Sequence, residues 1–182
     1  MDEVLNLENR RRIYQYIKSH PGTYLREMER ELGMETGVLS YHLRYMEKRN
    51  VIRVEDDGYW KRYFPSDRFH IRDRRTISVL MQPTPRRIVM YLLIHGKSSY
   101  NQILQEIGCA KSTLSYHLKR MVNRGILSLE KRDRESWYDI RDADATADLI
   151  IAMREGLKCD VVDRFTQIWE ELGRVAERSR DG

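Results

Sequence analysis

The chain of 182 residues lacks the sequence features that are typical of secreted and membrane proteins. Its two cysteines, Cys109 and Cys159, are too few for a disulfide framework and suit a reducing compartment. The longest uninterrupted apolar run, Ile88 to Ile94, is far shorter than the roughly 20 residues that cross a bilayer. The start, Met1-Asp2-Glu3, lacks the cations of a signal peptide. We therefore expect a cytoplasmic protein with no membrane partner.

The sequence also lacks the short motifs that mark common catalytic sites. It contains no glycine-rich phosphate loop, no His-Glu-x-x-His pair and no nucleophile elbow. Its carboxylates follow no paired arrangement that the sequence reveals. We therefore expect no enzymatic activity and no cofactor.

Positive charge gathers in the middle of the chain. Residues 1–70 carry 13 Lys and Arg against 12 Asp and Glu, residues 71–142 carry 14 against 7, and residues 143–182 carry 6 against 9. The central segment would attract a polyanion such as nucleic acid, with an affinity that falls as salt rises. A solvated basic face with no partner is the alternative.

One stretch of the sequence occurs twice. Shifting the chain by 75 positions aligns Leu39-Ser40-Tyr41-His42-Leu43 with the identical residues 114–118, and the alignment runs without a gap from Asn9 to Tyr63. Two copies are too few to stack into a solenoid. The repeat therefore predicts two copies of one small domain.

Each copy is predicted to begin with three helices. Asn9 and Thr84 are expected to cap the first helices. The second helices are expected to end at Gly33 and Gly108, because glycine suits a left-handed cap. The third helices carry apolar residues at helical spacing, which predicts a buried stripe. The stripe comprises Leu39, Leu43 and Met46 in copy one and Leu114, Leu118 and Met121 in copy two.

A β-hairpin is predicted after each third helix. In copy one the runs VIRVE and YWKRYF flank the turn Asp56-Asp57-Gly58, and in copy two ILSLE and SWYDI flank Arg132-Asp133-Arg134. We expect Trp60 and Trp137 to anchor these hairpins to the core. A helix-turn-helix followed by a hairpin is a winged helix. The expected fold is mainly α with small β-wings (α+β): two tandem winged helix-turn-helix domains plus a C-terminal amphipathic helix.

The residues of copy two resemble a known family. The run Leu80-x-x-Pro83-Thr84-x-Arg86-Arg87-Ile88 and the downstream IGCAKSTLSYHLKRMVNRGIL resemble ArsR-type and related MarR-like winged-helix regulators, over roughly Leu80 to Tyr138. Copy one departs from the family at Glu35 and Gly37. The two copies together resemble archaeal tandem winged-helix regulators. This resemblance implies sequence-specific binding of double-stranded DNA and regulation of transcription, with repression as the expected output.

The third helix of such a domain enters the major groove, so its outward face is the expected DNA contact. Copy one offers fewer cations there than copy two and should bind more weakly. The wings are expected to add cations that grip the DNA backbone, although protection of a sheet edge is the alternative for these charges. The predicted DNA contacts in copy one are Thr36, Ser40, Tyr41, Arg44, Lys61 and Arg62. Those in copy two are Lys111, Ser112, Thr113, Ser115, Tyr116, Lys119, Arg120, Lys131, Arg132 and Arg134.

Two kinds of residue leave alternatives open. His42 and His117 either pack against the first helix or have a functional role, and packing is preferred.

Metal sensing, which the family suggests first, is not expected, because the second helix of copy two has no Cys-x-Cys pair and residues 141–182 contain no His. Cys109 is either a small buried apolar residue, which is preferred, or part of an unusual thiol sensor. The sequence identifies no small-molecule effector.

The C-terminal segment carries an apolar stripe that needs a partner. It comprises Leu149, Met153, Leu157, Val161, Phe165, Ile168 and Leu172. We expect it to pair with the same segment of a second chain as a homodimer; packing back on its own domain is the alternative. Gly156 and Asp160 leave open whether the segment is one helix or two. The expected organisation is a first winged domain over 1–66, a linker or short helix over 67–82, a second winged domain over 83–142 and a dimerisation segment over 143–182.

Winged helices also serve as protein-binding modules, so the fold by itself leaves a second function open. The rival interpretation is a tandem winged-helix subunit of chromosome-segregation or transcription machinery. Salt dependence separates the two, since a DNA binder loses affinity steeply with salt and an apolar docking surface does not.

Overall fold

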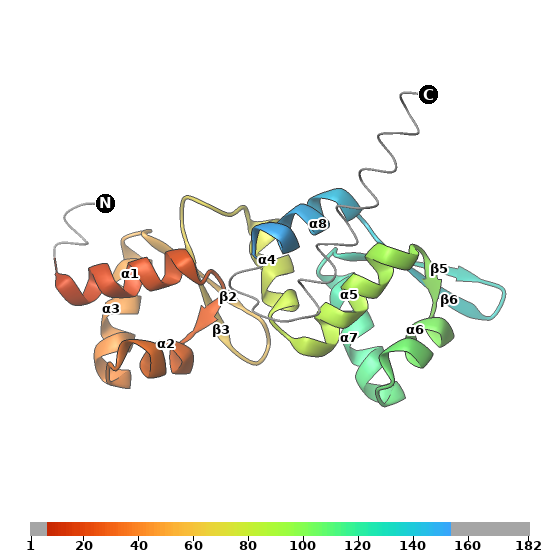
Figure 1. Cartoon of the computed structure of the whole chain (residues 1–182), viewed down its shortest axis with the longest axis horizontal. Coiled ribbons are helices and arrows are strands. Elements are labelled where there is room, and N and C mark those ends of the chain that lie inside the picture. Colours follow the sequence, from red (N-terminus) through yellow and green to blue (C-terminus); the bar gives the residue numbers. More distant parts are fainter. Residues whose placement is uncertain (1–6, 154–182) are drawn as a thin grey trace, which may run out of the picture. The chain divides into compact units, whose positions relative to one another are not determined.

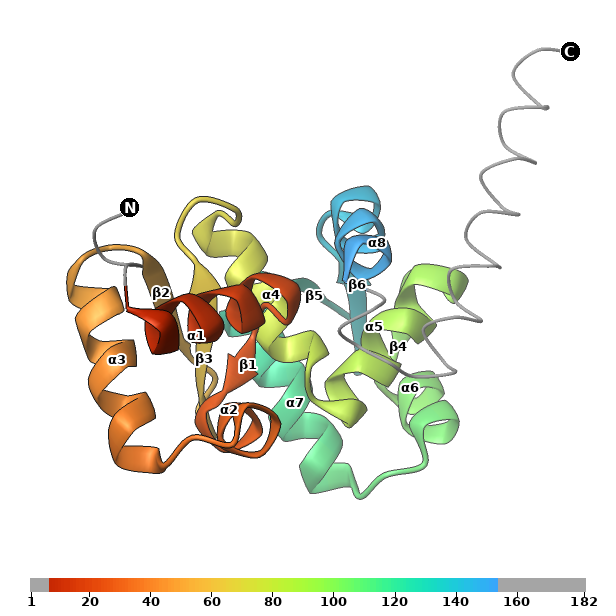
Figure 2. The same cartoon turned by 60° about the vertical axis from the view of Figure 1, so that its left-hand side comes forward.

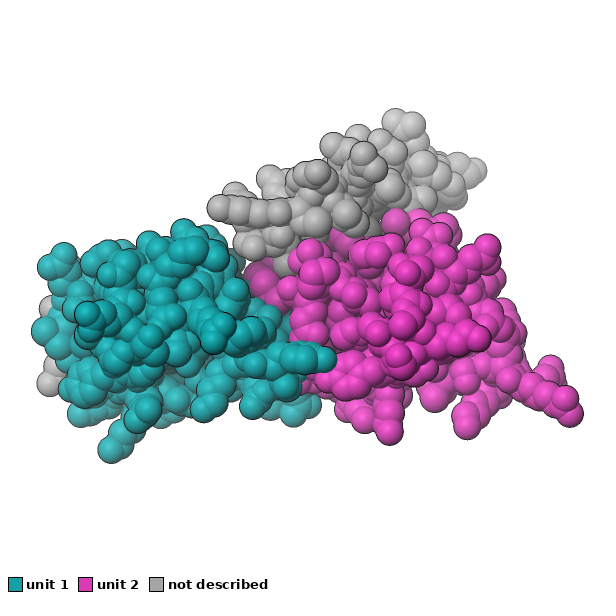
Figure 3. Space-filling model, turned by 90° about the horizontal axis from the view of Figure 1, so that it is seen from below, with its two compact units in different colours: residues 1–78 teal, residues 79–182 magenta. Residues whose placement is uncertain are grey.

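The computed structural model describes residues 7–153. The chain divides into two compact units, residues 1–78 and 79–182 (Figure 3), and each unit contains one copy of the repeat. Each unit is helical with a small antiparallel sheet, which confirms the predicted fold class. Among the described residues, no helix is long and apolar enough to cross a membrane.

Unit 1 contains three helices and a three-stranded sheet (Figure 1). Its elements are α1 (Glu8–Ser19), β1 (Thr23–Tyr24), α2 (Leu25–Leu32), α3 (Thr36–Lys48), β2 (Ile52–Asp56) and β3 (Lys61–Pro65). Figures 1 and 2 both show α2 and α3 joined by a short turn, which is the helix-turn-helix. The next helix, α4 (Ile71–Leu80), spans the boundary between the units.

Unit 2 repeats this order and adds a helix. Its elements are α5 (Pro83–His95), β4 (Ser98–Ser99), α6 (Tyr100–Ile107), α7 (Lys111–Asn123), β5 (Leu127–Arg132), β6 (Glu135–Ile140) and α8 (Ala143–Ala152). The side chain of Asp142 caps α8 by accepting a hydrogen bond from the amide of Ala145 at 3.2 Å.

Both hairpins form where the sequence predicts them, and each gains a third strand that the sequence analysis missed. The strand orders are β1-β3-β2 and β4-β6-β5, and all pairs are antiparallel. The third strands, β1 and β4, are two residues long. Two residues carry no alternating pattern, so only pairing with β3 and β6 creates these strands. They join each wing to the start of the second helix.

The ends of the helices test the capping predictions. Gly33 and Gly108 end α2 and α6 with φ of 63° and 64°, in the left-handed region that the sequence predicts. The predicted N-caps are wrong by two residues, since Leu7 and Gln82 precede α1 and α5. In α5 the proline ring at Pro83 fixes the first helical φ, which favours the earlier start.

The two third helices bury the predicted stripes. In unit 1 Leu39, Leu43 and Met46 join a core that includes Ile13 and Ile17 of α1. In unit 2 the equivalent stripe of Leu114, Leu118 and Met121 is also buried. Burial of this stripe fixes which face of each third helix points outward, and that face is the candidate site.

The segment predicted as a linker is largely helical. α4 covers residues 71–80 of the linker or short helix predicted over residues 67–82. Arg74 pairs with Glu55 of β2 at 3.1 Å and donates a hydrogen bond to the carbonyl of Phe69 at 2.6 Å. The first part of this segment is therefore attached to the wing of unit 1. The boundary between the compact units falls after Ser78, inside the predicted linker.

Candidate nucleic-acid interface

The outward face of α7 carries cations, hydroxyls and one ring. The predicted contacts that are exposed on it are Lys111, Ser112, Ser115, Tyr116 and Lys119. Thr113 is half-buried. Because the opposite side of the helix is the buried stripe, these side chains share one solvent-facing surface. Cations for phosphates and hydroxyls for base edges are the groups that DNA recognition uses.

Tyr100 of α6 orders the beginning of this face. Its hydroxyl donates a hydrogen bond to the carbonyl oxygen of Lys111 at 3.0 Å and also lies 3.0 Å from the hydroxyl of Ser115. A capping box closes the start of α6: the Ser99 amide donates to the Gln102 side chain at 2.8 Å, and the Gln102 amide donates to the Ser99 hydroxyl. The Ser-x-x-Gln pattern signals this box, which was not among the predictions. The Tyr100 hydroxyl thus connects the start of α6 to the start of α7.

Arg120 makes a contact within unit 2. The guanidinium of this half-buried residue donates a hydrogen bond to Gln82, the residue before α5, at 3.3 Å, and its Nη2 atom is buried. Arg120 therefore has a structural contact that the exposed Lys119 does not show, and its DNA contact stays a prediction.

The wing of unit 2 presents its cations to solvent. Lys131, Arg132 and Arg134 are exposed at the end of the β5–β6 hairpin, where Asp133 makes the tight turn with φ of 53°. Glu130 pairs with Arg132 along the same strand and with Lys97 before β4. Surface pairs of this kind contribute little to stability and exchange readily for another anion. The predicted roles of Arg132 and Arg134 stay compatible with this geometry.

The equivalent face of α3 is less basic at its start. Thr36 donates its hydroxyl hydrogen to the carboxylate of Glu29, and exposed Glu35 precedes the helix. Tyr41 and Arg44 are exposed and Ser40 is half-buried. Glu29 and Glu35 therefore lie near the first position of α3, whereas the first position of α7 is Lys111.

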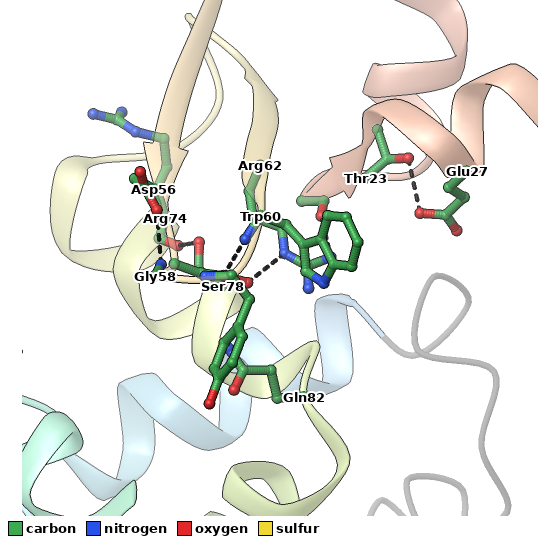
Figure 4. A network of polar contacts seen from close by, with 12 residues as sticks. Thr23, Glu27, Asp56, Gly58, Trp60, Arg62, Arg74, Ser78 and Gln82 are labelled. Carbon is green, nitrogen blue, oxygen red and sulfur yellow. Dashed lines mark hydrogen bonds and ion pairs between the residues drawn. The ribbon is translucent and has the colours of Figure 1, made fainter. Parts of the chain in front are cut away.

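Arg62 on the wing of unit 1 contradicts its prediction. It is only 5% exposed and pairs with the fully buried Asp57 at 2.8 Å. It also donates a hydrogen bond to the carbonyl of Gly22 at 3.1 Å, so it connects the wing to the turn after α1. Figure 4 shows Arg62 and Trp60 within the polar network of this wing. A guanidinium used in this way cannot reach DNA, whereas its neighbour Lys61 is exposed.

The Asp57 carboxylate organises the whole wing turn. Its oxygen accepts hydrogen bonds from the amides of Tyr59 and Trp60, each at 2.8 Å. Burial by itself would raise the pKa of Asp57, but the hydrogen bonds from Arg62 and these two amides outweigh burial and lower it. Trp60 is not a core anchor as expected: it is 41% exposed and packs on Tyr24 with ring centroids 5.1 Å apart.

Both repeated histidines are buried, which favours the packing interpretation. His42 and His117 are 8% and 9% exposed, and in the described residues neither Nδ1 atom has a hydrogen-bond partner. Burial lowers the pKa of each imidazole, and a nearby guanidinium lowers it further: Arg10 beside His42 and Arg120 beside His117. Both effects favour the neutral imidazole in the folded protein. The neighbouring tyrosines, Tyr41 and Tyr116, remain exposed.

The predicted dimerisation stripe lies mostly outside the described residues. Leu149 is half-buried and Met153 is buried. Helix α8 ends at Ala152, and the positions from Leu157 onward are outside the described residues. Cys109 is half-buried, which leaves both readings of this thiol open.

Comparison with known proteins agrees with this architecture. Residues 7–77 match a family model described as an N-terminal HTH domain, and residues 82–128 match bacterial regulatory protein, arsR family. The chain therefore contains two helix-turn-helix domains, and the second of them matches the arsR family. This confirms the family resemblance predicted from copy two.

The ArsR-like chain has a curated relative in an archaeon. It is 31% identical over 142 residues to the uncharacterized HTH-type transcriptional regulator MJ1398 of Methanocaldococcus jannaschii, covering 78% of this chain and 36% of the relative. The chain thus spans about a third of the length of that relative.

Solved structures also resemble the ArsR-like chain. HlyU from Vibrio cholerae is 18% identical, with 43% of this chain and 84% of that chain covered and a TM-score of 0.39. The transcriptional repressor PagR of Bacillus anthracis is 23% identical, with 44% and 92% covered and a TM-score of 0.40. These TM-scores are too low for the similarities to bear on function.

Proposed function

We propose that this chain binds double-stranded DNA sequence-specifically and regulates transcription, as a repressor, with unit 2 supplying most of the affinity. The observation that carries the proposal is the outward face of α7, where Lys111, Ser112, Tyr116 and Lys119 are exposed together opposite a buried stripe. Such a face offers phosphate contacts and base-edge contacts from one rigid helix.

The surroundings of α7 support this assignment. The wing that follows it exposes Lys131, Arg132 and Arg134, and residues 71–142 carry a net charge of +7 from 14 cations and 7 anions. A relative named as an HTH-type transcriptional regulator and the match to the arsR family point to the same activity. The positive field would draw the duplex, and α7 would choose the sequence.

The proposal is tested by comparing matched double variants. DNA fragments bound by the chain are first selected from the source genome, and the best fragment is then titrated by gel shift at fixed salt. We expect Lys111→Ala with Lys119→Ala to weaken duplex binding about tenfold or more and to make the salt slope about two units shallower. The matched variant of unit 1, Arg44→Ala with Lys48→Ala, should change duplex affinity by about twofold at most, because acidic Glu29 and Glu35 lie at the start of α3.

Equal losses from the two variants would overturn the ranking of the units. Affinity for a bound partner that hardly responds between low and physiological salt would instead favour the protein-interaction module.

We further propose a homodimer formed by the C-terminal segment, residues 143–182. Support comes from the spacing of Leu157, Val161, Phe165, Ile168 and Leu172, which keeps one apolar face. Met153 is already buried within the chain, so the proposed contact starts at Leu157. Sedimentation of the full chain should give a dimer, and Leu157→Glu with Phe165→Glu should give a folded monomer. A monomeric parent chain, or a double variant that stays dimeric, would contradict this contact.

A further inference from the structure

The outward face of α3 forms an open groove. A hollow of about 490 Å³ is lined by Gly37, Ser40, Tyr41, Arg44, Tyr45 and Lys48. These residues follow one another at steps of three, one, three, one and three, so they share one face of the helix. The groove lies opposite the buried stripe of α3, and the absence of a side chain at Gly37 opens its first end.

Two kinds of side chain run along this groove in parallel. Tyr41 and Tyr45 form one row, and Arg44 and Lys48 form the other. The members of each row are four positions apart, which is about 6 Å along the helix axis. Tyr41 is 63% exposed. The groove therefore presents an aromatic row beside a cationic row.

The second tyrosine is held in place by cations. The guanidinium of Arg10 from α1 lies 4.2 Å from the centre of the Tyr45 ring, and that of Arg49 lies 5.4 Å from it. Arg10 is itself only 9% exposed, so its position is fixed by packing. This arrangement adds positive charge to the end of the groove that Lys48 occupies.

The charges along α3 favour a single strand over a duplex. Glu29 and Glu35 lie at the start of the helix, where a duplex would bring two phosphate chains close to acidic groups. The cations lie only towards its other end. The bases of a duplex are stacked on one another and hide their faces, whereas an unpaired base offers a face to a tyrosine ring.

We infer that the α3 groove binds single-stranded nucleic acid, with a base stacked on Tyr41 and adjacent phosphates held by Arg44 and Lys48. The combination of exposed ring and cationic track is the one that sequence-tolerant single-strand binders use. This activity is separate from duplex recognition by α7.

Helix α7 lacks the parts that make the groove. The positions equivalent to Tyr45 and Lys48 are Arg120, which is held against Gln82, and Asn123. Tyr116 is the counterpart of Tyr41 and is also exposed, at 46%. Lys119 and Arg120 follow it in place of a second ring, and it belongs to the proposed duplex-binding face. The control is therefore a tyrosine outside both third helices, Tyr59, which is 59% exposed on the wing of unit 1.

The test measures fluorescence anisotropy of a labelled oligo(dT) with the full chain at low salt. We expect Tyr41→Ala to weaken binding about tenfold or more, Tyr41→Phe to retain most of it because the ring remains, and Tyr59→Ala to leave it unchanged. Arg44→Ala with Lys48→Ala should weaken binding and make its salt dependence shallower. Circular dichroism of each variant verifies that the chain is folded.

Single-strand binding by α3 and duplex binding by α7 can be disproved independently of each other. Lys111→Ala with Lys119→Ala should lose duplex affinity and keep oligo(dT) affinity. The inference is overturned if the parent chain does not bind oligo(dT), or if Tyr41→Ala and Tyr59→Ala weaken it equally. Absence of duplex binding alone would overturn the proposed function and leave this inference standing.

Discussion

Helices α3 and α7 share the sequence Leu-Ser-Tyr-His-Leu and the same buried stripe, yet their outward faces differ. Each places a guanidinium near its buried histidine, but from different helices. In unit 1 it is Arg10 of α1, which leaves position 45 of α3 free for a tyrosine. In unit 2 it is Arg120 of α7 itself. The same position of the third helix therefore carries a tyrosine of the aromatic row in unit 1 and an arginine in unit 2.

The two wings differ in the same sense. The wing of unit 1 is fixed by the buried Asp57–Arg62 pair, and the equivalent positions of unit 2 are exposed Arg132 and half-buried Trp137. A cation that stabilises its own hairpin is not available to a phosphate, whereas an exposed cation is. Duplication thus preserved the hairpin and changed the use of its charges.

The largest difference is expected from the buried pair. Asp57→Ala leaves the Arg62 guanidinium buried without its carboxylate and should lower the free energy of unfolding of unit 1 by about 3–5 kcal/mol. Asp133→Asn in the wing turn of unit 2 should cost less than about 0.5 kcal/mol, because asparagine accepts a positive φ and the site is exposed. Denaturant unfolding measures both, and similar costs would show that the wings are equally dependent on their turns.

Acidic solution offers a second readout of this pair. The pKa of Asp57 is lowered in the folded protein, so its contribution to stability is present above the unfolded value of about 3.9 and is lost as the pH falls through the folded value. The parent chain should therefore lose an increment of stability below about pH 4 that Asp57→Ala does not show.

A smaller difference separates two neighbouring cations of α7. Arg120→Ala removes the hydrogen bond to Gln82 and should lower the free energy of unfolding by about 1–3 kcal/mol. Lys119→Ala should change stability by less than about 0.5 kcal/mol, because the side chain is exposed, while weakening duplex binding. Thermal unfolding and gel shift on the same preparations measure the two effects. A loss of DNA affinity from Arg120→Ala at unchanged stability would support the predicted DNA contact of this residue.

The smallest expected effect is common to both units. Because the pKa values of His42 and His117 are lowered by burial, the folded protein resists protonation that the unfolded chain accepts. The contribution to stability should be constant above the ordinary value of about 6.5 and should decrease as the pH falls below it towards the folded values. Unfolding at pH 7.5 and pH 5.5 measures this decrease.

A matched set of histidine variants identifies its source. His42→Gln with His117→Gln should show a smaller decrease than the parent chain, and His70→Gln, at an exposed position, should behave like the parent. An unchanged decrease in the double variant would assign the pH dependence to other groups.

The buried stripes and the glycine caps of the helices could be predicted from the sequence. The stripe of Leu39, Leu43 and Met46, its repeat in α7, and the caps at Gly33 and Gly108 depend on helical spacing and on glycine's access to positive φ. The hairpin turns were equally visible. The first helix of each unit starts two residues earlier than predicted, and in α5 the proline at the first helical position favours the start without a capping side chain.

The order of neighbouring residues is therefore enough to predict the repeat, the three helices and hairpin of each unit, and the face of each third helix that points outward. It does not predict which cations remain on that surface, because this depends on contacts made in the folded chain. Arg62 pairs with the buried Asp57 of its own hairpin, and Arg120 donates a hydrogen bond to Gln82 from the segment before α5. The sequence does not distinguish a cation that faces solvent from one that faces a buried carboxylate. Whether a cation can contact DNA is therefore a property of the folded chain.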